Sequence, residues 1–196
     1  MATKKTKNQI EVIILYDTRE QSLEYLKTIQ IDKKVGSDGI KIIGVEKEIC
    51  KPNQCRISTG DVTFKWRIKD SDNEWQYSNL CIEIKKGLDE FSSLYTKDNR
   101  CRLQDEVNRA FEEKMDFYFL ITDNLTELNK KILKIPKFKC SKQSSPTHTF
   151  FNHYMKFNEY LSSKGFREML CIGEDIGFVI RRLVKDNIIK NKLQYL

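Results

Sequence analysis

Residues 61–85, DVTFKWRIKDSDNEWQYSNLCIEIK, decide the predicted fold. Hydrophobic side chains occupy every second position from Val62 to Ile68, which is typical of a strand with one buried face. The polar residues 69–74 predict a turn, and residues 75–85 return as an antiparallel neighbour. Asp61 would therefore begin one strand while Glu83 and Lys85 end the next. Glu83 and Lys85 share a face because side chains repeat every two residues along a strand.

Strand-like and helix-like segments alternate through the rest of the chain. Continuous apolar runs, such as the one that ends at Asp17, predict strands buried on both faces, and apolar residues at helical spacing predict helices. The further strands are expected at 10–16, 40–49, 117–121 and 168–172, and the helices at 21–30, 88–95, 100–113, 125–133, 150–161 and 176–193. This alternation predicts an α/β domain whose mixed β-sheet is flanked by helices on both faces.

Length and composition favour one intracellular domain. The chain has 196 residues, which we divide into a basic tail at 1–9 and a single domain at 10–196. Its formal charge of +7 favours a polyanionic partner such as nucleic acid. No apolar run approaches a membrane span, so we expect a soluble protein of the cytoplasm, or of the nucleus in a eukaryote. The six irregularly spaced cysteines indicate reduced thiols, and Cys50 and Cys55 lack the second pair that a zinc site needs.

Three carboxylates and a lysine stand at the ends of predicted strands. Asp17, Asp61 and Glu83 offer the oxygen ligands that Mg²⁺ prefers, with Glu20 as an outer member. A divalent ion in such a site lowers the pKa of bound water and neutralises charge that develops on a phosphodiester. Lys85 would direct an ammonium group toward the attacking water or the phosphate. The chain is therefore predicted to be a nuclease.

Four motifs follow one another along the chain: Asp17-Thr18-Arg19-Glu20, Gly60-Asp61-Val62, Glu83-Ile84-Lys85-Lys86-Gly87-Leu88-Asp89 and Arg100-Cys101-Arg102-Leu103-Gln104. Their order resembles that of the XPF-type structure-selective endonucleases, a branch of the PD-(D/E)xK nuclease superfamily. The resemblance implies a restriction-endonuclease-like fold. This chain has Ile84 where the family has arginine, and we expect no helix-hairpin-helix module beside the single domain, although family members commonly carry one.

The resemblance also implies an activity, a cofactor and a partner. The activity is metal-dependent cleavage of branched, flap or forked DNA in repair or recombination, with Mg²⁺ as cofactor and Mn²⁺ able to replace it. The products would carry 5′-phosphate and 3′-hydroxyl ends. The protein would form a homodimer, or a heterodimer with a related subunit.

The same likeness assigns roles to residues of this chain. Asp61 and Glu83 would be the principal metal ligands, with Asp17 and Glu20 as supporting acids. Lys85 would be the base that positions water or an electrostatic stabiliser. Arg19, Arg100 and Gln104 would lie around the site, where they contact phosphate or order the acidic groups, and Lys86 is predicted as a further DNA contact.

Several features have simpler explanations that the sequence leaves open. Asp17 and Glu20 suit the N-terminus of the following helix, and Glu83 and Lys85 suit an exposed charge pair on a sheet. The lysine-rich residues 130–142 form either a solubilising loop or a DNA contact. Two other functions remain: a catalytically silent DNA-binding subunit of a nuclease complex, and a sequence-specific restriction-type nuclease.

Overall fold

The structure is a computed structural model of the chain, and it describes residues 9–17, 23–48, 60–69, 74–85, 97–122, 156–171 and 175–192. The helices expected at 88–95 and 125–133, the basic segment 130–142 and residues 1–8 of the N-terminal tail lie outside these residues.

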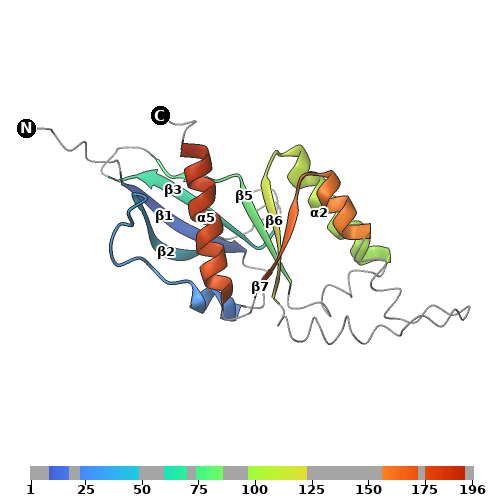
Figure 1. Cartoon of the computed structure of the whole chain (residues 1–196), viewed down its shortest axis with the longest axis horizontal. Coiled ribbons are helices and arrows are strands. Elements are labelled where there is room, and N and C mark those ends of the chain that lie inside the picture. Colours follow the sequence, from blue (N-terminus) through green and yellow to red (C-terminus); the bar gives the residue numbers. More distant parts are fainter. Residues whose placement is uncertain are drawn as a thin grey trace, which may run out of the picture.

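One mixed β-sheet organises the described residues (Figure 1). Its seven strands lie in the order β2-β1-β3-β5-β6-β7, with β4 paired to β3. The strands are β1 (Ile10–Asp17), β2 (Ile40–Glu48), β3 (Val62–Ile68), β4 (Gln76–Tyr77), β5 (Leu80–Lys85), β6 (Asp116–Thr122) and β7 (Arg167–Cys171).

Strand direction brings distant parts of the chain to one edge of the sheet. β1 runs parallel to β2, while β3 runs antiparallel to both β1 and β5. β5, β6 and β7 run parallel to one another. It follows that β1, β5, β6 and β7 all end at the edge where β3 begins, which we call the carboxyl edge.

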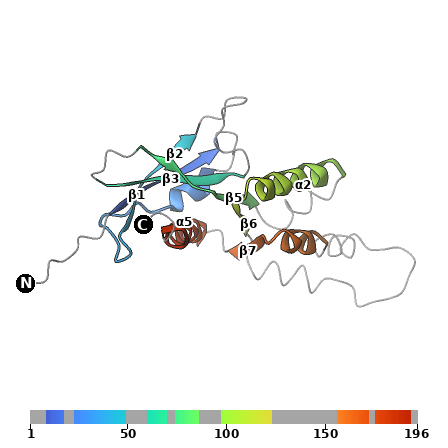
Figure 2. The same ribbon diagram turned by 90° about the horizontal axis from the view of Figure 1, so that it is seen from above.

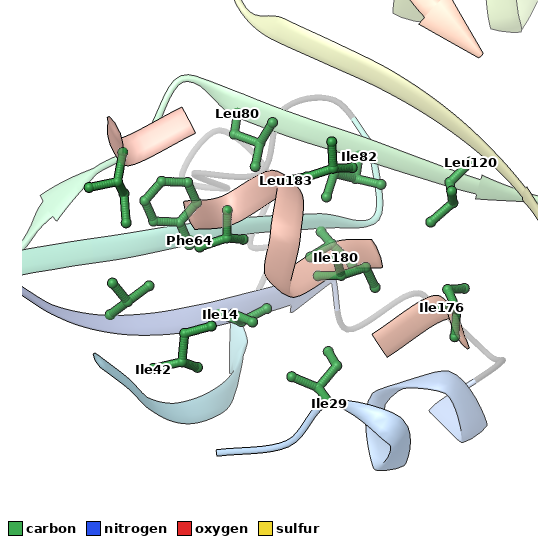
Figure 3. Packing of buried hydrophobic residues seen from close by; sticks show 14 of the residues in the cluster. Ile14, Ile29, Ile42, Phe64, Leu80, Ile82, Leu120, Ile176, Ile180 and Leu183 are labelled. Carbon is green, nitrogen blue, oxygen red and sulfur yellow. The ribbon is translucent and has the colours of Figure 1, made fainter. Parts of the chain in front are cut away.

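Helices cover both faces of the sheet (Figure 2). Helix α5 (Ile176–Lys192) and the 3₁₀ helix η1 (Leu23–Thr28) pack on one face, against β1, β2, β3 and β5. Figure 3 shows this core, where Ile180 and Leu183 of α5 lie over Ile14 and Phe64 of the sheet. Helix α2 (Lys97–Glu112) and the helical residues 156–163 pack on the opposite face, against β5 and β6. The predicted fold class, a restriction-endonuclease-like mixed sheet flanked by helices, is confirmed.

Two local predictions were wrong. The helix expected at 21–30 is the short 3₁₀ helix η1, which ends where the Thr28 hydroxyl donates a hydrogen bond of 2.6 Å to the carbonyl of Tyr25. The same hydroxyl accepts a 3.0 Å hydrogen bond from the N–H of Gly177, which anchors the segment to α5. The return strand expected at 75–85 is divided into β4 and β5. Lys65 pairs with Tyr77 but Val62 pairs with Ile82, so the register with β3 shifts by two residues between β4 and β5. Within the described residues, none of the helices is long and apolar enough to span a membrane.

Candidate functional site

The candidate site lies at the carboxyl edge, where β3 begins between the ends of β1 and β5. The backbone N–H of Asp17 donates a 2.9 Å hydrogen bond to the carbonyl of Asp61, and the N–H of Asp61 donates one of 2.9 Å to the carbonyl of Ile82. Asp17 ends β1, and Ile82 directly precedes Glu83. Two backbone hydrogen bonds therefore align all three predicted acids, although they are up to 66 positions apart in the sequence.

The Asp61 side chain is fixed toward β5. Its Oδ2 accepts a 2.7 Å hydrogen bond from the backbone N–H of Ile84, the residue between Glu83 and Lys85. A hydrogen bond from a neutral donor to a charged acceptor is stronger than one between neutral groups. This contact therefore holds the carboxylate beside the two charged side chains of β5.

Gly60 permits this arrangement through its backbone. Its φ of +79° is a conformation that residues with a side chain rarely adopt. A Cβ at this position would lie 2.3 Å from Sγ of Cys81 and 3.1 Å from the carbonyl oxygen of Ile82. The chain can thus pass close to β5 and deliver Asp61 only because residue 60 is glycine.

Glu83 and Lys85 contact each other on one face of β5. The ammonium Nζ of Lys85 donates a hydrogen bond to Oε1 of Glu83. The side chains are 6% and 13% exposed, respectively, so this pair is not the solvated surface pair that the sequence left open. Cys81 shares their face of the strand and packs in the cluster beneath α2.

Two of the acids are buried, which is unusual for carboxylates. Among the described residues four polar or charged residues are buried, and Asp17 and Glu83 are two of them, at 3% and 5% exposure of the whole residue. The other two have structural roles: the Thr63 hydroxyl bonds the carbonyl of Leu80, and Asn187 of α5 bonds Ser78 and Asp116. Burial of a carboxylate costs free energy, and such groups concentrate at functional sites.

The negative charge of the site affects its neighbours. Burial raises the pKa of the Cys81 thiol well above its ordinary value, and the carboxylates of Glu83 and Asp61 raise it further. Cys81 is therefore a neutral thiol at physiological pH. It packs against the site as an uncharged side chain.

The donor atoms fit a hard cation in kind, although the described residues do not present a ready-made metal site. The three carboxylates supply only oxygen, as Mg²⁺ and Mn²⁺ prefer. No group of three His, Cys, Asp or Glu side chains in the described ranges is arranged to hold a metal ion. Lys85 already engages Glu83, and the Ile84 N–H already engages Asp61. A cation would thus require these side chains to reorient.

The remaining predicted residues fall in two groups. Arg19, Glu20 and Lys86 lie outside the described residues, as does the side chain of Arg100. Gln104 is half-buried on α2, and its backbone carbonyl accepts a 3.4 Å hydrogen bond from the Tyr160 hydroxyl. The chain reverses between α2 and β6, so the first turns of α2 lie toward the carboxyl edge.

Sequence reasoning missed two contributors to the site. The backbone N–H of Ile84 has no sequence signature, because any residue except proline supplies one. Thr122, at the end of β6, donates a 3.3 Å hydrogen bond to the carbonyl of Lys85 and so fixes the end of β5. Its position directly after the apolar run 117–121 was the available signal.

Comparison with known proteins gives a distant likeness. No family model and no curated protein matches the chain. Five chains among the solved structures do match. One is XPF from Aeropyrum pernix, with a TM-score of 0.49 and 14% sequence identity over 92% of this chain and 67% of that one. The likeness is distant and concerns the fold alone.

Proposed function

We propose that this protein is a metal-dependent DNA endonuclease. The observation that carries the proposal is the convergence of Asp17, Asp61 and Glu83 from three strands at the carboxyl edge, beside Lys85. Two of the three carboxylates are buried, and burial of a charged group lowers the free energy of unfolding. In open α/β sheets, ligands bind outside the carboxyl ends of the strands.

Each residue has a distinct proposed task. Asp17, Asp61 and Glu83 would hold Mg²⁺ or Mn²⁺, which when bound supplies an activated water and neutralises charge on the phosphodiester. The hydrogen bond from Ile84 orients Asp61 before a cation binds. Lys85, which now donates to Glu83, would transfer its hydrogen bond to the attacking water or a phosphate oxygen. The supporting acid would be Glu20, as the sequence motifs imply. The proposed DNA contacts are Arg19, Lys86, Arg100 and Gln104.

The proposed substrate is branched, flap or forked DNA, cut as a homodimer or as a heterodimer with a related subunit. Support for this substrate comes from the order of the four sequence motifs. The net charge of +7 supports a polyanionic partner in general.

The test is cleavage of a labelled panel of flap, fork, four-way, single-stranded and linear duplex DNA, with Mg²⁺ or Mn²⁺ and with EDTA. Metal-dependent cuts in branched substrates that vanish in Asp61→Asn and Glu83→Gln would support the proposal. The matched control is Asp186→Asn, which removes an exposed carboxylate of α5. Equal cutting of linear duplex at defined sequences would favour a restriction-type nuclease instead.

A catalytically silent DNA-binding subunit is the second candidate. The Glu83–Lys85 ion pair favours it, because this contact satisfies the buried carboxylate without a cation. DNA binding with no cleavage under either metal, unchanged in Glu83→Gln, would establish this alternative.

A further inference from the structure

A groove of about 510 Å³ lies at the edge of the sheet opposite the candidate site, where β6 and β7 begin. Loops that follow two helices form one side, and the end of α5 contributes the other. The groove is lined in part by Phe111, Lys114, Asp116, Lys164, Arg167 and Lys190.

Two helices end near the starts of β6 and β7 (Figure 1), and residues from both ends line the groove. After α2, Lys114 has a φ of +55° and the Met115 N–H bonds the carbonyl of Ala110 at 2.8 Å. After the helical residues 156–163, Gly165 has a φ of +76° and the Phe166 N–H bonds the carbonyl of Leu161 at 3.0 Å. Both are left-handed caps that return the chain to adjacent parallel strands, β6 and β7. The two caps therefore lie side by side and form one side of the groove.

Positive charge dominates the groove. Four cationic side chains line it, against the single carboxylate of Asp116. That carboxylate is already engaged by Lys190, at 3.0 Å, and by the amide of Asn187. Lys164 lies with its Nζ 4.5 Å from the ring centre of Phe111, which is 49% exposed. A cation held over an exposed aromatic ring suits contact with both a phosphate and a base.

Helix capping alone does not account for these cations. Lysines near the carboxyl ends of helices interact favourably with the helix dipole, which explains Lys114 and Lys164. Arg167, however, is the exposed first residue of β7, and its guanidinium makes no hydrogen bond or ion pair with any described residue. Lys114 also takes up a left-handed conformation that glycine adopts without strain, as Gly165 does in the neighbouring cap.

We infer that this groove binds the phosphate backbone of a nucleic acid and forms a second contact, remote from the site of cleavage. The inference deepens the proposed function and rests on it for the identity of the polyanion. Strand β6 separates the groove from the carboxyl edge, and its seven residues span roughly 20 Å at about 3.3 Å per residue. A duplex arm of about six base pairs, at 3.4 Å each, has the length to reach from one to the other.

The test measures DNA binding in EDTA, by fluorescence anisotropy over a series of KCl concentrations, so that cleavage plays no part. The full chain is compared with Lys114→Gly/Arg167→Gln. Loss of two phosphate contacts reduces the slope of log K against log[salt] by about two units. Lys33→Gln/Lys34→Gln removes the same charge from an exposed loop and should leave the slope close to that of the parent. Lys114→Gly also relieves the backbone at a positive φ, so this variant should unfold at the same temperature as the parent or higher.

Each outcome decides the inference. A reduced slope in the groove variant alone supports it, as does disappearance of the difference when the duplex arm is shorter than about six base pairs. Equal slopes in the groove variant and the parent would overturn it. Displacement of DNA by polyglutamate as readily as by unlabelled DNA would also overturn it and indicate an acidic protein partner. If the parent cuts no DNA, the proposed nuclease function fails, while the salt slope still decides whether the groove binds nucleic acid.

Discussion

The carboxylate of Asp61 accepts a 2.7 Å hydrogen bond from the backbone N–H of Ile84, so the residue directly before β3 is tied to the centre of the Glu83-Ile84-Lys85 motif. Side chains alternate along β5, and Ile84 packs into the core beneath α5 while Glu83 and Lys85 face the other side. Ile84, which stands where the family that the motifs resemble has arginine, is therefore a core residue. Its backbone, not its side chain, serves the site.

Replacement of Asp61 should separate charge from hydrogen bonding. Asparagine keeps an oxygen that can accept from the Ile84 N–H, whereas alanine leaves that N–H without its partner. We expect both variants to lose cleavage by on the order of 10²-fold or more, because both lose the charge. Only Asp61→Ala should lose stability as well, by about 1–3 kcal/mol, which urea unfolding can measure. Equal unfolding free energies in the two variants would show that the hydrogen bond does not matter for stability.

Replacement of Gly60 should lower the stability of the protein. Gly60→Ala introduces a side chain at a φ of +79° and places a Cβ 2.3 Å from Sγ of Cys81. We expect a loss of roughly 1–3 kcal/mol in the free energy of unfolding. In a double-mutant cycle, Cys81→Ala removes the sulfur but not the strain in φ, so the double variant should recover part of the loss. A coupling energy of zero between the two substitutions would rule out the close approach.

Strand β3 could be predicted from alternation, and β1 and β6 from continuous apolar runs. The meeting of Asp61 with Glu83 across a hairpin could be predicted as well. The position of Asp17 beside them depends on β3 pairing with β1 as well as β5, a long-range choice that local patterns do not specify. Burial of the Glu83–Lys85 pair likewise depends on α2 and the helical residues 156–163 covering that face. Residues 21–30 show the limit of periodicity, since apolar spacing suggested a longer helix than the connection to β2 contains.

Lys85 should affect cleavage and metal binding in opposite directions. In Lys85→Met the ammonium no longer holds Oε1 of Glu83, so the carboxylate becomes more available to a cation. We expect cleavage to be lost while Mn²⁺ affinity, measured by calorimetry, equals or exceeds that of the parent. Glu83→Gln should weaken Mn²⁺ binding on the order of 10- to 100-fold, as loss of a metal-site interaction commonly does. Weaker Mn²⁺ binding in Lys85→Met would show that the lysine supports the cation site instead of competing for it.

Cys81 should make the protein less stable in alkaline solution. Burial, and then the carboxylates of Glu83 and Asp61, raise the pKa of its thiol well above the ordinary value. In the unfolded chain the thiol ionises near pH ~8.5, so above that pH the unfolded state binds fewer protons than the folded state. The free energy of unfolding therefore falls as pH rises, by up to about 1.4 kcal/mol per pH unit for this one group.

Urea unfolding between about pH 8 and 9.5 tests this below the range where tyrosines titrate in the unfolded chain. Cys81→Ala should flatten the decline and Cys101→Ala, which removes an exposed thiol, should not. Parallel curves for the two variants would mean that the thiol is not held neutral beside the acids.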